Sequence, residues 1–592
     1  MAINFSPGPR LLPLRLPRVC VAISGRDGAA MVEKAEAICR DNPFVEFRLD
    51  HIRQPGLALQ RISRFLEVHP QVIAVATCRR ASNGGRFKGS VASQVEILAK
   101  AARAGCQIID VELQTAESLK SAAYAKLRSL AAVALSFHDF RGTRKLDETY
   151  DRMRKVSADI YKVVSTATTL ADNVTMMHFL ERFAGQENVV GVCMGEQGII
   201  SRVLALRAGS LFTFASAAEG EETAPGQISI RNLNALYRID YIDRATRIFG
   251  VAGNPVGQSL SPLIMNAAFR RETVNGVFLP LHAKTVLDLL TCIREVPVQG
   301  ISITMPYKQA ILEHLDNTDA LTARIGACNT VVRTQDGKLF GFNTDVAGVL
   351  RPLEHRLHIT GARILVLGAG GAARAAVFGL KDRGAEVYVT NRTVEKAQKL
   401  ARQAKAHYIR RADLKKTQFD VIINATSVGM GNSKESPLVA EELNAKLVFD
   451  MVYQHETRLL RMAREKGLQV ITGEEMFVHQ AARQFEIWTA KPAPVSEMWA
   501  IIHNAVAARN AAHSEAAGAD KRSSSGSRSM NQGDAPAGGL SENVARPPAA
   551  GNTSRSSKSS QAASRNGKPR HAENHAENKE KPPRRKPARS SR

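Results

Sequence analysis

The chain of 592 residues has few aromatic residues, few cysteines and no long apolar segment. Its seven cysteines stand at scattered positions, and none forms the Cys-x-x-Cys pair that is typical of metal sites and redox centres. This spacing favours free thiols in a reducing compartment over a disulfide framework. We therefore expect no bound metal.

Segments that target a chain to a membrane are also lacking. No stretch reaches the roughly 18 consecutive apolar residues of a membrane span, and the nearest one, residues 364–373, is rich in glycine. Four prolines interrupt the first 17 residues, so that no apolar core of a signal peptide remains. We expect a cytoplasmic protein, with no membrane partner and with residues 1–17 as an N-terminal extension.

Acidic residues are too few to balance the basic ones, and the formal net charge is +25. The excess is densest in residues 514–592, which carry 16 Lys and Arg against 7 Asp and Glu. This segment has only three large apolar residues and cannot bury a core, so we expect a disordered basic tail. Weak polyanion binding is the alternative to a solvated appendage, although the tail has no aromatic residues on which bases could stack.

Eight strand-like runs recur in the first 240 residues, and most are separated by segments with helical spacing. They are Val19–Ser24, Phe44–Leu49, Val72–Cys78, Gln107–Leu113, Ala132–Phe137, Asp159–Ser165, Val189–Met194 and Leu211–Ala215. This alternation predicts a (β/α)8 TIM barrel over residues 18–243. An open, doubly wound sheet is the structural alternative.

A different α/β pattern begins at Arg247, with strand-like runs at Ile248–Ala252 and Gln299–Thr304. Strand-like Arg363–Leu367 then leads into a glycine-rich turn, which predicts a Rossmann unit. We expect one α/β domain at 247–350, completed by helices within 475–510, and a Rossmann domain at 358–474.

Lys162 lies among β-branched residues of a predicted barrel strand. Burial of a charged lysine is costly and favours the neutral amine, which can attack a ketone to form a Schiff base. An exposed or salt-bridged lysine at the strand end remains the alternative.

Further polar residues fall at the predicted carboxyl ends of the strands, where barrels place their chemistry. They are Glu46, Arg48, Arg79, His138, Asp139, Arg202 and Gln227. Because arginine binds carboxylate through a bidentate fork, the set predicts a pocket for a carboxylated, polyhydroxylated substrate.

These residues belong to short segments that follow one another in a specific order. The segments are Glu46-Phe47-Arg48, Thr77-Cys78-Arg79, Ser136-Phe137-His138-Asp139-Phe140, Ala158-Asp159-Ile160-Tyr161-Lys162, Ser201-Arg202 and Ala224-Pro225-Gly226-Gln227. The ordered set resembles type I 3-dehydroquinate dehydratase over about residues 18–240.

The resemblance implies that Lys162 forms an imine with the substrate ketone and that His138 moves the proton during loss of water. It implies that Arg202 holds the carboxylate, and that the remaining substrate-binding or organising residues are Glu46, Arg48, Arg79, Thr223 and Gln227. Asn83 stands where many members of the family carry a glutamate, which puts the orientation of His138 in question.

The glycine-rich turn of the second half fits G-x-G-x-x-A between a strand and a helix, a pattern typical of dinucleotide binding. Its candidate cofactor residues are Gly368, Gly370, Gly371, Ala372 and Ala373. After the next strand, Asn391-Arg392-Thr393 and then Lys396 stand where an NAD site places an acidic residue. A neutral and basic sequence there suits the 2′-phosphate of NADP.

Other segments of the second half resemble shikimate dehydrogenase over about residues 247–508. They are Gly253–Pro262, Ser302–Lys308, Gly326–Thr330, Asn343–Asp345, Asn424–Met430, Asp450–Tyr453 and Glu475–Ala481. The resemblance implies that Lys308 and Asp345 are the catalytic pair. It further implies a substrate-binding domain with contacts from Ser259, Ser261, Thr304, Asn329, Tyr453 and Gln480, and cofactor contacts from Thr426, Met451 and Gly473.

The chemistry of the catalytic pair follows from the charge that hydride addition creates on a ketone oxygen. A lysine ammonium can stabilise that charge and supply the proton, and a nearby aspartate keeps the lysine charged. Two serines, Ser259 and Ser261, favour shikimate over quinate as the alcohol, again by resemblance. Oxidation of quinate with NAD is the alternative, against which the Asn391-Arg392 position argues.

The two resemblances fit together because the product of the first reaction is the substrate of the second. We expect a bifunctional enzyme of the shikimate pathway, which leads to chorismate and the aromatic amino acids. It would dehydrate 3-dehydroquinate and reduce 3-dehydroshikimate to shikimate with NADPH.

Overall fold

The fold was analysed in a computed structural model, which describes residues 15–525 except 258, 431–433 and 454. The chain divides into a compact unit that ends at Arg522 and a second unit from Ser523 onward. Most of the expected tail, residues 526–592, and the extension up to residue 14 lie outside the described residues. No described helix is long and apolar enough to cross a bilayer.

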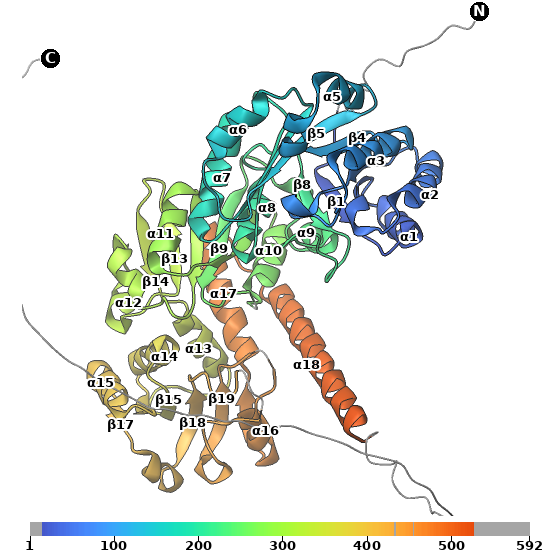
Figure 1. The fold of residues 1–592 in the computed structure, drawn as a ribbon. Coiled ribbons are helices and arrows are strands. Elements are labelled where there is room, and N and C mark those ends of the chain that lie inside the picture. The colour runs from blue at the N-terminus through green and yellow to red at the C-terminus, as the bar shows by residue number, and fades with distance from the viewer. Residues whose placement is uncertain (1–14, 258, 431–433, 454, 526–592) are drawn as a thin grey trace, which may run out of the picture. The chain divides into compact units, whose positions relative to one another are not determined.

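Strands between Val19 and Ser216 form a barrel of parallel strands, which confirms the predicted (β/α)8 fold (Figure 1). The strands are β1 (Val19–Ile23), β2 (Phe44–Arg48), β3 (Ile73–Thr77), β4 (Ile108–Glu112), β5 (Ala132–His138), β6 (Ile160–Thr166), β7 (Val189–Met194) and β8 (Thr213–Ser216). Each pairs with its sequence neighbour up to β7, and β1 also pairs with β8, which excludes an open doubly wound sheet. On the β7 side, the N–H of Leu211 donates to the carbonyl of Val189 (2.8 Å).

Helices alternate with these strands along the chain. They are α1 (Gly28–Cys39), α2 (Pro55–Val68), α3 (Val91–Arg103), α4 (Leu113–Ser118), α5 (Ser121–Arg128), α6 (Leu146–Arg154), α7 (Leu170–Phe183), α8 (Ile199–Leu204) and α9 (Ile230–Ala235). The strands are almost wholly buried, because barrel side chains pack inside and helices cover the outside.

The next domain is a six-stranded mixed sheet in the order β10-β9-β11-β13-β14-β12. Its strands are β9 (Arg247–Gly253), β10 (Gly276–His282), β11 (Val298–Ile303), β12 (Asn317–Thr318), β13 (Thr330–Arg333) and β14 (Leu339–Phe342). Its helices are α10 (Ser261–Arg271), α11 (Val286–Glu295), α12 (Ala320–Ile325) and α13 (Asp345–Glu354). The sequence pattern identified only β9 and β11 of these strands.

The third domain has the strand order of a Rossmann fold, β17-β16-β15-β18-β19-β20, which confirms the second fold prediction. Its strands are β15 (Arg363–Leu367), β16 (Glu386–Thr390), β17 (His407–Tyr408), β18 (Phe419–Asn424), β19 (Ala445–Asp450) and β20 (Gln469–Ile471). Its helices are α14 (Gly371–Asp382), α15 (Val394–Ala404) and α16 (Arg458–Glu465). The strand order reverses between β15 and β18, where such sheets bind their ligands.

Two C-terminal helices return to the middle domain, α17 (Gly473–Thr489) and α18 (Val495–Ser525). Phe485 and Trp488 of α17 pack with Met498 and Ile502 of α18 against aromatic residues of the middle sheet, including Phe249. The last helix ends at Ser525 and not near Asn510, so it enters the segment that we expected to be disordered.

The barrel and the middle domain share one apolar core. Helix α7 packs against α11, α8 packs against β10, and the buried side chains form a single cluster across both domains. Asp288 of α11 also accepts hydrogen bonds from the backbone N–H groups of Leu170 (2.9 Å) and Ala171 (3.4 Å), at the start of α7. A carboxylate of one domain therefore satisfies the amino-terminal N–H groups of a helix of the other.

Candidate active sites

Lys162 of β6 is buried inside the barrel, with 5% of its surface exposed. Its Nζ lies 3.0 Å from Oδ2 of Asp110 on β4 and 3.4 Å from Oε1 of Glu46 on β2. The ring of Phe214 on β8 lies beneath the ammonium, with its centroid 4.0 Å away. The lysine is thus both buried and salt-bridged, and its two carboxylates can stabilise the ammonium or accept its proton.

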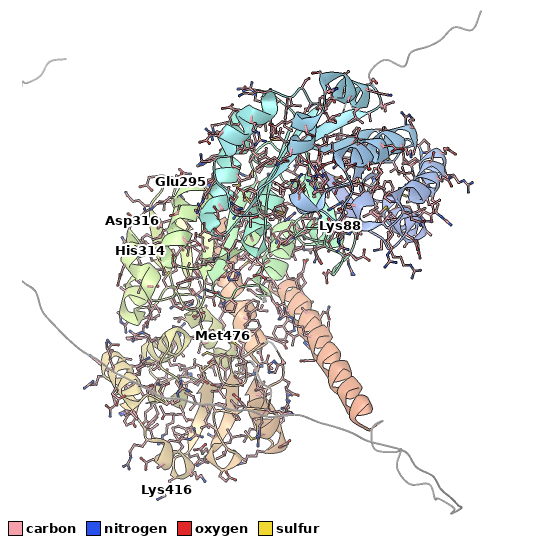
Figure 2. All side chains as sticks on the ribbon, viewed as in Figure 1. Lys88, Glu295, His314, Asp316, Lys416 and Met476 are labelled. Atoms are coloured by element: carbon pink, nitrogen blue, oxygen red, sulfur yellow. The ribbon has the colours of Figure 1, made fainter. Side chains whose placement is uncertain are left out.

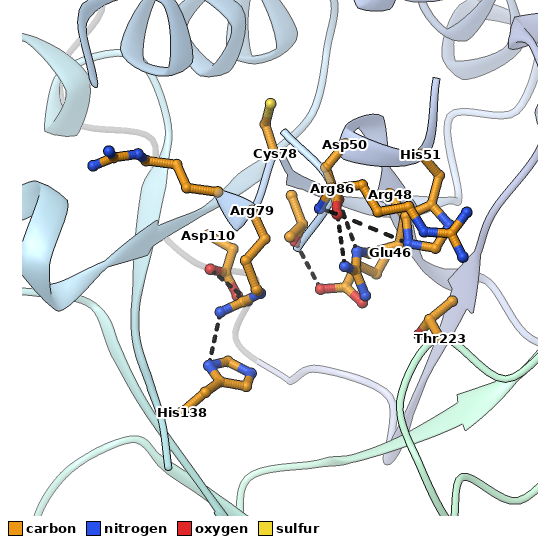
Figure 3. Close-up of polar contacts among 12 residues, drawn as sticks. Glu46, Arg48, Asp50, His51, Cys78, Arg79, Arg86, Asp110, His138 and Thr223 are labelled. Carbon is orange, nitrogen blue, oxygen red and sulfur yellow. Dashed lines mark hydrogen bonds and ion pairs between the residues drawn. The ribbon is translucent and has the colours of Figure 1, made fainter. Parts of the chain in front are cut away.

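Arg79, just after β3, connects Asp110 to His138 (Figure 3). Its Nη2 donates to both oxygens of Asp110 at 3.0 Å, and its Nη1 lies 2.7 Å from Nδ1 of His138. Ser136 donates to the same aspartate at 2.6 Å. Because guanidinium can only donate, Nδ1 is the accepting nitrogen, and the ring proton lies on Nε2.

The charges of this network set the protonation of its members. Burial alone would raise the pKa of Asp110, but the charges of Arg79 and Lys162 outweigh it and hold that pKa far below its usual value. Burial lowers the pKa of His138 well below its usual value, and the same two positive charges add to the effect. His138 is therefore a neutral imidazole at neutral pH.

Arg48 and Asp50 form a second buried pair beside the first. Arg48 donates through Nε (3.0 Å) and Nη2 (2.9 Å) to the two oxygens of Asp50. Asp50 also accepts the backbone N–H of Arg86 (3.1 Å), which fixes the loop that follows β3. Burial and the adjacent Arg48 lower the pKa of His51 to about 4, so this histidine is also neutral.

Arg202 of α8 differs from the other two arginines because no carboxylate of the described part of the chain is paired with it. It is 2% exposed, and its Nη2 donates to the carbonyl of Pro225 at 3.1 Å. Its Nε is buried without a hydrogen-bond partner among the described residues, and burial lowers its pKa to about 10. An uncompensated buried guanidinium fits an anionic ligand such as a carboxylate.

The loops at the same end of the barrel bring in the remaining candidates. Oε1 of Gln227 accepts hydrogen bonds from the backbone N–H (2.8 Å) and the hydroxyl (3.2 Å) of Thr223, which fixes the amide. Asn83 lies in a short 3-10 turn, and its Nδ2 is buried without a partner among the described residues. His138 is instead held by Arg79 and by the stacked ring of Phe140, 6.1 Å between centroids.

Sequence reasoning missed Asp110, the residue that joins Lys162 to Arg79. A signal was present, since two acidic residues, Asp110 and Glu112, interrupt a strand that is otherwise apolar. Buried acids are rarely tolerated in such a strand without a partner. Asp50 and His51 were missed as well.

The second candidate site is a cavity of about 690 Å³ between the middle domain and the Rossmann domain. It is lined by 18 of the residues predicted for this half. They are Ser259, Ser261, Thr304, Lys308, Asn329, Asp345, Gly370, Gly371, Ala372, Asn391, Arg392, Thr393, Lys396, Thr426, Met451, Tyr453, Gly473 and Gln480. Ser302, Arg374, Lys399 and Met476 also line it but were not among the predicted residues (Figure 2 labels Met476).

Lys308 and Asp345 form an ion pair on this cavity through Nζ and Oδ2. Asp345 is the first residue of α13, where the helix dipole stabilises a carboxylate. Asn329 donates to its other oxygen at 2.8 Å and to the hydroxyl of Thr344 at 3.0 Å. A Cβ at Gly371 would lie 3.2 Å from Cδ of Lys308, so a side chain there would press on the lysine.

The opposite end of the cavity fits a dinucleotide phosphate. Arg392, Lys396 and Lys399 line it from the loop after β16 and from α15, and no acidic side chain is among the lining residues there. A Cβ at Gly370, the residue before α14, would meet nothing within 4 Å, so the helix N-terminus is open to a phosphate.

Two predicted cofactor residues, Gly368 and Ala373, do not line the cavity. Gly368 has φ +117°, and a Cβ would lie 3.0 Å from the carbonyl oxygen of Ala425, so this glycine is needed for the turn itself. Ala373 is fully buried in the Rossmann core.

Comparison with known proteins follows the same division of the chain. Residues 19–244 match the type I 3-dehydroquinase family, and 251–331 match the shikimate dehydrogenase substrate binding domain. Residues 353–451 match the shikimate / quinate 5-dehydrogenase family, and 473–502 match the shikimate 5′-dehydrogenase C-terminal domain.

Individual relatives cover either most of the chain or less than half of it, on the shikimate dehydrogenase side. The bifunctional 3-dehydroquinate dehydratase/shikimate dehydrogenase of Arabidopsis thaliana, a chloroplastic protein, is 34% identical over 80% of this chain and 82% of its own. The NADP(+) shikimate dehydrogenase of Pyrococcus furiosus is 39% identical over 43% of this chain and 95% of its own. A solved structure of shikimate 5-dehydrogenase from Thermus thermophilus, in complex with NADP(H) and shikimate, is 37% identical and covers 44% of this chain and 99% of that one, with a TM-score of 0.41.

Proposed function

The chain belongs to the family of bifunctional 3-dehydroquinate dehydratases/shikimate dehydrogenases, and from this we propose that it converts 3-dehydroquinate to shikimate in two steps. The barrel dehydrates 3-dehydroquinate to 3-dehydroshikimate, and the second half reduces this product with NADPH. The enzyme thereby serves the shikimate pathway toward chorismate and the aromatic amino acids. One observation carries the proposal: two lysine–carboxylate sites in one chain, each surrounded by groups suited to one of the two reactions.

In the barrel, Lys162 is the nucleophile. Its Nζ attacks the ketone carbon after transferring a proton to a neighbouring carboxylate, for which Glu46 lies at 3.4 Å, while Asp110, at 3.0 Å, stays ionised beside Arg79. Loss of the carbonyl oxygen as water leaves an iminium. The iminium withdraws electrons from the adjacent carbon, so that its proton becomes acidic.

His138 then completes the elimination in our proposal. It takes the proton from the adjacent carbon and returns one to the leaving hydroxyl, and water finally hydrolyses the iminium to release the enone and Lys162. Its low pKa keeps the imidazole neutral, and the ring accepts the proton at Nδ1 once the hydrogen bond from Arg79 to this nitrogen is broken. Arg202 binds the substrate carboxylate, while Glu46, Arg48, Arg79, Thr223 and Gln227 bind hydroxyls or hold these groups in place.

In the second site, Lys308 is the acid. As the ketone oxygen gains negative charge, the ammonium stabilises it and gives up its proton, and Asp345 keeps the lysine charged between turnovers. Ser259, Ser261, Thr304, Asn329, Tyr453 and Gln480 are the proposed substrate contacts around this pair.

NADPH, when bound, supplies the hydride. Its 2′-phosphate would lie against Arg392 and Lys396, with Asn391 and Thr393 beside them, and its pyrophosphate would lie at the start of α14 near Gly370, Gly371 and Ala372. Thr426, Met451 and Gly473 line the cavity toward the substrate-binding residues. The basic lining at the phosphate end supports NADP over NAD, and it weighs against oxidation of quinate with NAD.

The compartment and the tail are further parts of the proposal. All seven cysteines are free and buried, which supports a reducing compartment, the cytoplasm.

The basic segment from Ser514 onward would bind polyanions weakly at most. Deletion of residues 526–592 should then change neither activity and should remove any salt-dependent retention on heparin.

A single-cuvette assay tests the function. Purified protein receives 3-dehydroquinate and NADPH, the loss of NADPH absorbance is followed, and NADH is used in parallel. Consumption of NADPH from 3-dehydroquinate requires both steps. If 3-dehydroshikimate alone is reduced, the dehydratase assignment fails. If neither substrate is consumed, the bifunctional assignment fails.

A further inference from the structure

The guanidinium of Arg202 is held by little else than the backbone around it. Among the described residues it makes one hydrogen bond, from Nη2 to the carbonyl of Pro225 at 3.1 Å. The N–H of Gly195 donates to the same carbonyl at 3.0 Å. The position of the guanidinium therefore depends on α8, which carries Arg202, and on the 3-10 turn Glu196–Gly198, which follows Gly195 and leads into α8.

Asn173 of α7 holds both of these segments. Its side chain is fully buried, and its Nδ2 donates to the carbonyl of Gln197 in the 3-10 turn at 2.8 Å. Its Oδ1 accepts the backbone N–H of Ser201, the residue before Arg202, at 3.1 Å. Because one partner is a carbonyl and the other an N–H, the two ends of the amide are assigned by their partners. One side chain of α7 thus fixes both the helix that carries Arg202 and the turn beside it.

Helix α7 is in turn attached to the reductase half. Oδ1 of Asp288 accepts the N–H groups of Leu170 (2.9 Å) and Ala171 (3.4 Å), the first two residues of α7. The carbonyl of Leu170 accepts a hydrogen bond from Nδ2 of Asn173 at 3.4 Å. Asp288 and Asn173 therefore bind the two backbone polar groups of the same buried residue. Loss of the carboxylate would leave the first N–H groups of α7 without an acceptor among the described residues, so that this turn could shift.

The middle domain also supports α8 directly. Strand β10 packs against both α8 and the 3-10 turn before it, while α7 packs against α8 on one side and α11 on another. Helix α8 therefore lies against one element of the middle domain and against a second element that this domain holds. The barrel without the middle domain would lack both supports.

We propose that Asp288 is a positioning residue of the dehydratase that is supplied by the reductase half of the chain. By holding the first turn of α7 it holds Asn173, and through Asn173 it keeps Arg202 in place for the substrate carboxylate. The inference rests on the proposed function of the barrel site. A guanidinium that is fixed before the substrate arrives binds its carboxylate with a smaller loss of entropy. The fusion thus gives the dehydratase a part that its own barrel does not contain.

Steady-state kinetics of both reactions in the full chain test this inference. Asp288→Ala should raise KM for 3-dehydroquinate about 5-fold and change kcat of dehydration less than about two-fold, because the affected contact binds the substrate and takes no part in the chemistry.

Thr285→Ala is the matched control. Thr285 is the N-cap of α11, its hydroxyl oxygen accepts the N–H of Asp288 at 3.1 Å, and it makes no hydrogen bond to α7 among the described residues. The control weakens the same end of α11 and should leave KM for 3-dehydroquinate unchanged. If Thr285→Ala raises this KM as much as Asp288→Ala does, the inference is wrong.

A double variant separates positioning of Arg202 from a general loss of structure. Combined with Arg202→Met, Asp288→Ala should raise KM for 3-dehydroquinate no further, because Asp288 acts through the arginine. Multiplication of the two KM increases would contradict the inference. Reduction of 3-dehydroshikimate and KM for NADPH should stay unchanged in the Asp288 variant, because this residue does not line the second cavity. A parallel loss of both activities would mean that Asp288 only stabilises the fold.

Asp288→Asn provides a second, milder variant should Asp288→Ala fail to fold. Its amide oxygen can still accept a hydrogen bond but carries no charge, so KM for 3-dehydroquinate should rise about two-fold, and this rise should also vanish in combination with Arg202→Met. An unchanged KM in every folded Asp288 variant would overturn the inference. Absence of dehydration by the unaltered chain would instead contradict the proposed function.

Discussion

Each of the two candidate sites contains a lysine beside an aspartate, but the surroundings of the two pairs differ. In the barrel, Lys162 has two carboxylates and an aromatic ring around it, all of them buried. In the second site, Lys308 has one carboxylate and faces a cavity, and its side chain is 19% exposed against 7% for Lys162.

The difference matches the two kinds of chemistry. A lysine that must become a nucleophile needs a group that can take its proton, and Glu46 is within reach at 3.4 Å. A lysine that acts as an acid must stay charged until it transfers its proton to the substrate oxygen. One carboxylate, Asp345, is sufficient to keep that charge.

The strongest test of this comparison removes each lysine in turn. Lys162→Ala should lower the dehydratase rate by at least about 10³-fold, because no amine remains to form the imine, and should leave reduction of added 3-dehydroshikimate intact. Lys308→Met should give the opposite pattern, with kcat of the reductase lowered about 10²- to 10⁴-fold. Both activities are measured on the same preparations, and a parallel loss of both in either variant would contradict two independent sites.

The next largest effect concerns the anion site of the barrel. Arg202→Met should raise KM for 3-dehydroquinate about 30- to 100-fold, because the substrate carboxylate loses its buried guanidinium. The same change should raise the melting temperature, since it removes an uncompensated buried charge.

Arg48→Met serves as the matched control, because it leaves Asp50 unpaired and should lower the melting temperature. A fall in the melting temperature of Arg202→Met would mean that its charge is compensated in a way that the described contacts do not include.

A smaller effect is expected at the cofactor end of the second site. Arg392→Gln should weaken NADPH binding about 10-fold and leave NADH binding unchanged, because only NADPH carries the 2′-phosphate. Nucleotide fluorescence measures both affinities without turnover. Arg402→Gln, on the same helix as Lys396 but away from the cavity, is the control for loss of charge. Equal weakening of both nucleotides would remove the basis for NADP preference.

The smallest expected change is in the pH profile of the barrel. The pKa of His138 lies well below its usual value because of burial, Arg79 and Lys162, so this residue stays neutral as the pH falls through about 6.5. The dehydratase kcat should therefore change less than about two-fold between roughly pH 8 and pH 6.5, and its acidic limb should lie lower. An acidic limb centred near pH 6.5 would show that substrate or solvent restores the ordinary pKa.

The low pKa of His138 should also make the stability of the folded protein depend on pH. Below about pH 6.5 the unfolded chain binds a proton at His138, whereas in the folded protein this histidine stays neutral. The free energy of unfolding should therefore decrease as the pH falls below about 6.5. Urea titrations at several pH values measure this decrease.

The sequence predicted the barrel and the Rossmann domain well because parallel strands in these folds are short apolar runs. The sequence pattern identified only β9 and β11 of the middle sheet, and physical reasons explain why strands were missed. Strand β10 contains Pro280, which is tolerated because β10 is the edge strand of its sheet. Strand β12 has two residues and leaves no periodic pattern.

The residues of the candidate sites also differ in how well the sequence predicts them. Residues within compact motifs, such as Lys308 and Asn329, could be predicted because the motif fixes both their type and their spacing. Asp110 was missed, because the acidic residues of its strand indicate a buried polar group but not its partner, and the barrel brings Asp110 of β4 to Lys162 of β6 across 52 positions of sequence. Nothing in the sequence indicates that Asp288 meets α7, because this contact joins two domains of the fold.

The apolar core that runs from the barrel into the middle domain joins the two halves of the chain as folded units. Cutting the chain near residue 245 would expose the faces of α7 and α11 to water and would leave the first N–H groups of α7 without Asp288. Exposed apolar surface of that kind promotes aggregation. The domains of a fused enzyme are often treated as independent units that can be expressed separately or exchanged. Here the junction is part of the folded interior, and the two halves share buried residues there.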